Sequence, residues 1–398
     1  MREKKLQILY ITTMAVAVIS SNFIVCAISV LWCMVALAIY LRKNGNKIRY
    51  GNKFGYAKFI YVYFLFPTII IHLYTMVLIL FGITDINVLS SNMLTYLPIL
   101  LTIASIYLFH EKVLMYDFII IIMAWVAEAA IRINKYGSYI IISSIKSVFG
   151  CQNAVGFFEV NDIVHAVGYV WLFYLFSSYR TRKNIARILV PLAIIFILGF
   201  KRIGLLAVIG TTLYYIILPK NNIKLSYRIC RIVSVVICFF GIGYIWILGH
   251  TQVFENILTK YNIDTLSRNI FYRYIIVQTT FSPTFLGYGR GSVKIEMLNI
   301  FHNFSHVHSD IVKMFYEIGL IPFLIWITFY FSGMLKIFKK KFNAKSAIFY
   351  SFVAAYTFIL YLTDNTEAYF VCRLIRTTMP VVYAVCYSNL STEKLLSS

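Results

Sequence analysis

Residues 232–249 have the sequence IVSVVICFFGIGYIWILG, an apolar run that contains no charged side chain. A helix needs roughly 20 such residues to cross the hydrocarbon core of a bilayer. Similar runs recur along the 398-residue chain, which is 60% hydrophobic and only 13% charged, whereas soluble proteins are about 25% charged. The sequence therefore predicts an all-α polytopic membrane protein. It excludes a disordered chain, a soluble nucleic-acid-binding domain and a secreted disulfide scaffold.

The apolar runs predict about 12 transmembrane helices. They leave no soluble domain between them, so we expect residues 1–398 to form a single integral membrane domain. The expected spans are 6–20, 22–41, 58–83, 88–109, 113–130, 161–179, 187–200, 203–218, 232–249, 312–335, 346–362 and 372–390.

The distribution of Lys and Arg indicates the orientation, because short cytoplasmic loops carry an excess of these residues. With the N-terminus inside, most of the 37 basic residues lie in the inner segments. We therefore expect a multi-pass protein of the cytoplasmic (inner) membrane with both termini in the cytoplasm. Two outer segments remain basic: the hairpin mouth at residues 200–202 and the one large outer loop between late spans, residues 250–312.

Arginine on the outer surface suits phosphate, because its planar guanidinium stays charged and can bond two oxygens at once. In the large outer loop, Ser267 can cap a short helix that runs to about Thr280. Arg268 and Arg273 on this helix are five positions apart, which separates them by about 140° around the axis. Either both flank a ligand from two sides or only one contacts it.

A glycine-rich stretch and a group of histidines follow this helix. The sequence GYGRG at residues 287–291 either brings backbone N–H groups close to an anion or forms a flexible turn. His302, His306 and His308 do not have the spacing of a zinc motif, and no cysteine is close, so we expect no metal and no cofactor. These histidines are either polar residues at the membrane interface or include a general base.

The acidic residues of the outer segments contain no Asp-x-Asp pair, which many sugar transferases need to hold a diphosphate through a metal. A diphosphate would then be neutralised by arginine. Glu128 and Arg132 are four positions apart and share one helical face, as an ion pair would. A structural role and a functional role for this pair both remain open.

Three motifs resemble the O-antigen polymerase and O-antigen ligase superfamily. HSDIVKMFYEIGL at residues 308–320 is similar to the family pattern His-Asn-x-Tyr-Leu followed by Glu-x-Gly, with Ser309 where Asn is commonest. Residues 268–289 resemble its run of Arg, aromatic residue, Pro and Gly-x-Gly. FKRIGLLA at residues 200–207 resembles its Ser-Arg-x-x-Leu-Leu hairpin, with Lys201 in place of Ser. The order of the motifs and the twelve-span layout agree with the family in outline.

The resemblance implies a metal-independent membrane glycosyltransferase of the GT-C-like fold that uses undecaprenyl-diphosphate-linked glycans. A Wzy-type polymerase would join lipid-linked oligosaccharide repeat units into O-antigen or capsular polysaccharide at the outer face of the cytoplasmic membrane. Its partners would be membrane lipid and the flippase and chain-length regulator of the same pathway, with no nucleic acid.

The resemblance also implies roles for individual residues. His308 would be the base or would position the acceptor, and Glu317 would orient His308 or act as the base itself. The loop aromatics Tyr261, Tyr272 and Tyr288 would either stack on sugar faces or simply pack. The diphosphate would be held by Arg202, Arg268, Arg273 and Arg290.

Alternative functions remain open. An O-antigen ligase, which transfers the polymer to lipid A core, shares these motifs, and the polymerase is favoured because it is the more common and varied member. Another enzyme of lipid-linked glycans is a further alternative. A lipid-linked sugar transporter (flippase) would be expected to carry charge in mid-membrane and to have pseudo-symmetric halves. Here the charges gather on one outer surface and no internal repeat is visible.

Overall fold

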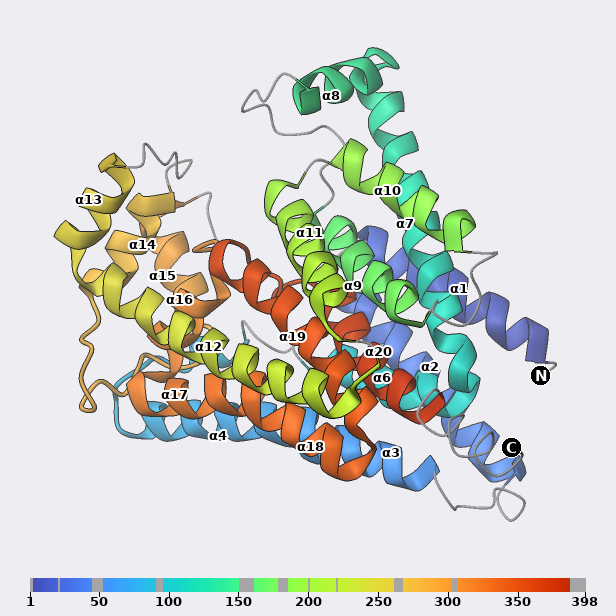
Figure 1. Cartoon of the computed structure of the whole chain (residues 1–398), viewed down its shortest axis with the longest axis horizontal. Coiled ribbons are helices and arrows are strands. Elements are labelled where there is room, and N and C mark those ends of the chain that lie inside the picture. The colour runs from blue at the N-terminus through green and yellow to red at the C-terminus, as the bar shows by residue number, and fades with distance from the viewer. Residues whose placement is uncertain are drawn as a thin grey trace.

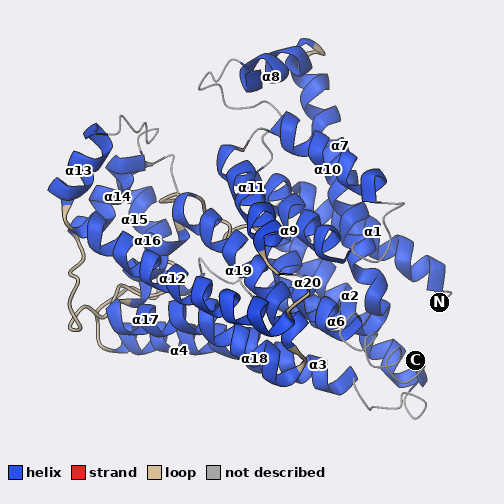
Figure 2. Cartoon of the chain, viewed as in Figure 1, coloured by secondary structure: helices blue, strands red, loops and turns tan. Residues whose placement is uncertain are grey.

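The computed structural model describes residues 3–20, 22–44, 53–90, 96–149, 161–177, 185–199, 201–219, 221–260, 268–302 and 306–386. All regular structure within these ranges is helical (Figure 2). Helices α1 and α2 lie at one end of the helix bundle, and α13 to α16 lie at the opposite end (Figure 1).

The helices follow the apolar runs of the sequence closely. Their bounds are α1 (Glu3–Ser20), α2 (Phe23–Asn44), α3 (Lys53–Ile60), η1 (Tyr61–Leu65), α4 (Phe66–Leu80), α5 (Asn87–Ser90), α6 (Leu97–Phe109), η3 (His110–Lys112), α7 (Val113–Tyr136), α8 (Tyr139–Phe149), α9 (Asn161–Ser177), α10 (Ile185–Gly199), α11 (Arg202–Ile217), α12 (Ile223–Gly249), α13 (Thr251–Lys260), α14 (Arg268–Val277), α15 (Ser292–Phe301), α16 (Asp310–Ile318), α17 (Leu320–Thr328), η6 (Phe329–Gly333), α18 (Met334–Lys341), α19 (Ala344–Thr363) and α20 (Phe370–Cys386).

Six helices in the described ranges are long and apolar enough to cross a membrane, which supports a multi-pass membrane protein. They are Ile24–Lys43, Gly55–Leu80, Val113–Tyr136, Ile223–Gly249, Leu320–Lys341 and Ala344–Thr363. The other expected spans are also helical but shorter, because their described helices have at most 18 residues. The expectation of twelve spans is therefore confirmed for helix formation and, by length and composition, for six spans.

The expected span 312–335 is divided. Helix α16 ends at Ile318, and α17 starts at Leu320, because Gly319 between them has a φ of 75°. A Cβ atom at Gly319 would collide with the backbone of Phe285 and Leu286, so this close approach requires glycine. The break separates α16, which belongs to the region after α12, from the long span that starts with α17.

Two of the long spans contain a π-helical turn. In one, η1 joins α3 to α4, and in the other, η6 joins α17 to α18. A π-turn inserts one extra residue into a helix, is rare, and often occurs at functional sites. Both turns belong to helices that run side by side in the lower part of Figure 1.

Helix α19 is the central span. The share of its apolar window that is buried inside the protein is 83%, whereas the corresponding share is 17–33% in the other five long helices. It packs against α9, α11, α12, α18 and α20. Small residues such as Ala347, Ser351 and Ala354 allow this close packing on several sides. Its C-terminal end, at Thr363, therefore lies among the ends of several other elements.

The segment after α12, which the sequence predicts as one large outer loop, contains four helices in its described residues. The expected helix from Ser267 to about Thr280 is present as α14, although Ser267 itself lies outside the described residues. Helices α13, α15 and α16 complete the region, and all four helices lie together at one end of the bundle (Figure 1).

The ion pair expected between Glu128 and Arg132 is present, with 3.7 Å between their charged atoms.

We predict that residues 221 and 252, at the two ends of α12, face opposite sides of the membrane. Helix α12 has 27 residues and is therefore about 40 Å long, enough to cross a bilayer. A membrane-impermeant maleimide should label Gln252→Cys in right-side-out vesicles and Asn221→Cys only in inside-out vesicles. The background for both variants carries Cys151→Ser and Cys386→Ser, and it is the blank because the other five cysteines are buried. Labelling of both positions from one side would contradict the topology.

Candidate functional site

Charged side chains meet inside the protein where the C-terminal end of α19 approaches α16, α20 and the glycine-rich stretch. We call this group the buried charge cluster. Each of its members is at most 9% exposed. Its members are Arg290, Asp310, Lys313, Glu317, Glu367, Arg373 and Arg376.

Glu367 is the shared partner of the arginines in this cluster. Its carboxylate oxygens lie 2.5 Å from Arg373 Nη2 and 2.5 Å from Arg376 Nη1, and one is 3.9 Å from Arg290 Nη2. The Tyr361 hydroxyl also bonds to this carboxylate. The Arg376 guanidinium lies over the rings of Tyr330 and Tyr361, at 5.4 and 5.5 Å from their centroids. These contacts hold the guanidinium groups in fixed positions.

The glycine-rich stretch GYGRG does hold an anion, but that anion is Glu317 of the same chain. The Glu317 carboxylate accepts a hydrogen bond from Gly291 N and pairs with Arg290 Nη1, both at 2.9 Å. The N–H groups of Tyr288 and Gly289 donate to the carbonyl oxygens of Tyr316 and Glu317. The stretch is therefore hydrogen-bonded to the C-terminal end of α16, and these N–H groups already have acceptors within the protein.

Positive charge is in excess within the buried charge cluster. Four cationic side chains face three carboxyl groups. Burial raises the pKa of Asp310 to about 7, and the neighbouring Glu367 carboxylate adds to this rise. A buried excess of positive charge that includes three guanidinium groups favours the binding of an anion that can accept several hydrogen bonds.

A second group of polar residues surrounds Asp364, three positions before Glu367. The Asp364 carboxylate lies 2.9 Å from His165 Nε2 and 3.3 Å from Lys201 Nζ. Although burial alone would raise it, the hydrogen bond from His165 and the charges of His165 and Lys201 hold the pKa of Asp364 well below its usual range. Arg268 Nη1 donates to the Thr363 carbonyl at 2.8 Å. Residues 363–367 therefore link both groups.

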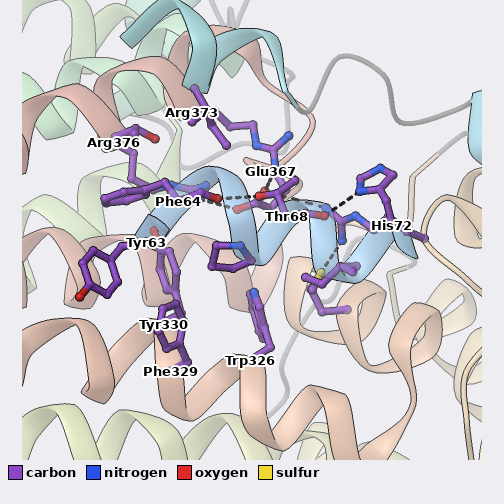
Figure 3. Close-up of a pocket in the computed structure, with 16 residues that line it drawn as sticks. Tyr63, Phe64, Thr68, His72, Trp326, Phe329, Tyr330, Glu367, Arg373 and Arg376 are labelled. Atoms are coloured by element: carbon purple, nitrogen blue, oxygen red, sulfur yellow. Dashed lines mark hydrogen bonds and ion pairs between the residues drawn. The ribbon is translucent and has the colours of Figure 1, made fainter. Parts of the chain in front are cut away.

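A cavity lies beside the buried charge cluster (Figure 3). Its volume is about 80 Å³. Arginines 290, 373 and 376 form its polar side, and the two π-turns contribute aromatic walls through residues 63 and 64 of η1 and 329 and 330 of η6. The arrangement combines a cationic patch with an apolar, aromatic surface between two long spans. Within the described ranges, no group of three or more His, Cys, Asp or Glu side chains is arranged to hold a metal.

The structure brings together only part of the set of residues expected from the sequence. Arg290 and Glu317 are in the buried charge cluster, and Arg268 is close to it through Thr363. Arg273 forms an ion pair with Glu255 at 2.9 Å on the surface, with the two side chains 64% and 51% exposed. Arg202 is the exposed first residue of α11. The four arginines therefore do not form one site.

The histidines also differ from expectation. The Glu317 carboxylate bonds to Arg290 Nη1 and Gly291 N, and the predicted orientation of His308 by Glu317 stays a prediction. His308 has a φ of 55°, an unfavourable conformation for a residue with a side chain. Its carbonyl accepts a 2.8 Å hydrogen bond from Tyr272. Burial, together with the charge of Lys313, lowers the pKa of His306 to about 4, so His306 is neutral at physiological pH.

The loop aromatics support packing over sugar stacking. The ring of Tyr272 is buried, and the Tyr288 hydroxyl donates to the Gln278 carbonyl at 2.9 Å. Tyr261 lies outside the described residues.

Glu367, Arg373 and Arg376 were not selected from the sequence. The signal for them was present, because RLIR at residues 373–376 places two arginines one helical turn apart in an otherwise apolar helix. Charge of this kind within a membrane helix is usually functional.

We predict that Glu367→Gln destabilises the protein strongly, by about 3–5 kcal/mol, because it leaves buried guanidinium groups without their shared carboxylate. The matched control is Glu255→Gln, which breaks an exposed ion pair worth about 0–1 kcal/mol. Thermal unfolding in detergent should show a large drop in melting temperature for the first variant and almost none for the second. Equal shifts would show that the shared carboxylate does not stabilise the cluster.

Comparison with known proteins gives no relative from which a function can be transferred. No family model, no curated protein and no solved structure matches this chain. The geometry of the buried charge cluster and its cavity is therefore the basis for a functional proposal.

Proposed function

We propose that this protein transfers a glycan from a polyprenyl diphosphate carrier to a second lipid-linked glycan, as a polymerase of oligosaccharide repeat units at the outer face of the cytoplasmic membrane. One observation carries the proposal. A buried excess of guanidinium groups lines a cavity whose other walls are aromatic and lie between two long apolar spans. The motif resemblance of residues 200–207, 268–289 and 308–320 supports the same conclusion.

The guanidinium groups suit the leaving group of this reaction. When the bond between the sugar and the carrier breaks, negative charge develops on the diphosphate, and fixed cations near that position lower the barrier. Arg373 and Arg376 are held in place by Glu367, and Arg290 is held by Glu317. Such a preorganised set of guanidinium groups supplies the charge that a divalent metal supplies in other transferases.

The apolar walls suit the lipid part of the substrate. Trp326 and the aromatic residues of η1 and η6 line the cavity next to the arginines. Outside it, α4 and α17 carry exposed apolar side chains, including Ile70 at 48% and Ile325 at 66% exposure. A polyprenyl chain can lie along this surface while its diphosphate enters the cavity. A soluble substrate would not require a site that borders the hydrocarbon core.

The test uses purified full-length protein and lipid-linked repeat units extracted from cells that lack this protein, with a chelator present. A ladder of products spaced by one repeat unit supports the polymerase. Transfer of the glycan to added lipid A core, without a ladder, would identify a ligase. No new glycosidic bond with either acceptor would overturn the transferase and favour a transporter of lipid-linked sugars.

We predict that Arg376→Lys lowers the rate of transfer by a factor of about 10² or more, because lysine cannot reproduce the planar contacts of guanidinium at a developing charge. Arg273→Ala is the informative comparison, since this guanidinium lies on the surface in its ion pair with Glu255. Full activity of that variant would place Arg273 outside the diphosphate site. If Arg273→Ala loses activity and Arg376→Lys keeps it, the site lies at α13 and α14 instead.

A further inference from the structure

The first turns of α12 carry three basic side chains in one exposed stripe. Lys224, Arg228 and Arg231 follow one another at intervals of four and three residues, and all three are exposed. Side chains at these intervals share one face of a helix. Cys230 and Ser234, in the same part of α12, are buried and lie on a different side. The basic stripe therefore faces away from the interior of the protein.

The end of α18 adds a second basic stripe beside the first. The start of α12 and the end of α18 lie next to each other, because Lys339 Nζ is 4.1 Å from the ring centroid of Tyr227 in α12 (Figure 1). Tyr227 is three residues after the first cation of the α12 stripe and four before the last. The two stripes therefore adjoin at this ring. We call their exposed cations the basic patch, which consists of Lys224, Arg228, Arg231, Lys336, Lys339 and Lys340.

The charge of the basic patch is not compensated by nearby acidic residues. The chain has no Asp or Glu in residues 203–254 or 318–363, which include both helices. None of the ion pairs formed by the described residues includes a member of the patch. Cations of one sign repel one another, and a bound anion relieves that repulsion. Clusters of this kind beside a membrane helix attract anionic lipids.

The depth of the α12 stripe matches the headgroup layer of a bilayer. Residues 232–249 form the uncharged part of α12, which is about 27 Å long and so close to the roughly 30 Å of the hydrocarbon core. Arg231 therefore lies at the edge of the hydrocarbon. Lys224 lies about 10 Å further out along the helix axis. The stripe thus spans the layer in which lipid phosphates lie, which is about 5–8 Å thick on each side.

The same side of α12 continues as an exposed apolar surface beyond Arg231. Ile232, Val235 and Phe239 are 64%, 42% and 70% exposed and continue the helical spacing of the stripe. The cations thus suit a charged headgroup, and the apolar side chains suit the acyl chain attached to it. A free phosphate or a soluble acidic protein would contact the cations only.

We infer that the basic patch binds an anionic phospholipid in the leaflet that adjoins it. The lipid phosphate lies beside Arg231 and Lys336, and an acyl chain lies along the apolar surface of α12. Arginine at the edge of the hydrocarbon suits this role, because its planar guanidinium can bond two phosphate oxygens at once. The distribution of basic residues predicts that this leaflet is the cytoplasmic one. The inference does not rest on the proposed function, since no member of the patch lines the cavity.

The test measures lipid retention by native mass spectrometry of the purified full-length protein in detergent with equal amounts of phosphatidylglycerol and phosphatidylcholine. We expect the unmodified protein to retain phosphatidylglycerol in preference. The double variant Arg231→Gln with Lys336→Gln should bind it about 30-fold more weakly, because each cation near an anionic headgroup contributes about fivefold. The charge-preserving variant Arg231→Lys should keep the preference.

Arg42→Gln with Lys43→Gln is the matched control. It removes two exposed cations from the last turn of α2, which the sequence predicts on the same side of the membrane. Its preference for phosphatidylglycerol should equal that of the unmodified protein. Both double variants change only exposed side chains, so both should keep the melting temperature of the unmodified protein in phosphatidylcholine alone. If the first double variant melts lower, Arg231→Gln alone takes its place in the same assay.

Three outcomes would overturn the inference. Equal retention of the two lipids by the unmodified protein would show that no anionic lipid is recognised. Equal losses in the two double variants would show a general effect of net charge and no site at the basic patch. If glycerol 3-phosphate, which has no acyl chain, displaces phosphatidylglycerol at equal concentration, the patch recognises free phosphate and not a lipid.

Discussion

The carboxylate of Glu367 is the interaction on which the interior of this protein depends. Guanidinium groups cannot be placed inside a membrane protein without a partner, because the loss of hydration is too costly. Glu367 serves Arg373 and Arg376 at once and lies within 3.9 Å of Arg290. Its own backbone N–H donates to Asp310, and the Asp310 N–H donates to the Asp364 carbonyl. The connection between α19 and α20 is therefore fixed to the start of α16.

The same principle explains the role of Glu317. Its carboxylate accepts a hydrogen bond from Gly291 N in the glycine-rich stretch and pairs with Arg290. Each arginine of the cavity thus pairs with a carboxylate of the protein itself. The cluster can stay folded when the cavity is empty, which a site made of arginines alone could not do.

Much of the architecture follows from local sequence. The apolar runs predict the helices, and the basic turns predict an orientation, because both depend on the residues of one segment. Helix α14 and the ion pair of Glu128 and Arg132 are also local features, and both are present. The sequence does not predict the break at Gly319, because the close approach there involves the backbone of Phe285, which is far away along the chain. The shortness of α10 and α11 is visible in the hydropathy, since the expected spans 187–200 and 203–218 have nearly the same bounds.

The site depends on contacts that local patterns do not contain. The sequence singled out Arg290 and Glu317, but it could not show that they bind one another across 27 positions. Arg373 and Arg376 are not among the residues predicted from the sequence, although their spacing in α20 is a usable signal. Glycine and arginine together suggested a phosphate cradle, and the anion was instead an internal carboxylate.

The two π-turns have a consequence for how the long spans tolerate change. Each turn adds one residue to a helix that otherwise repeats every 3.6 residues, so the side chains before and after it are offset by about 100°. Deleting a single residue within η1 or η6 would restore a regular helix and rotate one half of the span relative to the other. The lipid-facing side of that half would then turn inward. The register of these spans is thus set at the cavity, and single-residue insertions or deletions should be far less tolerated there than substitutions.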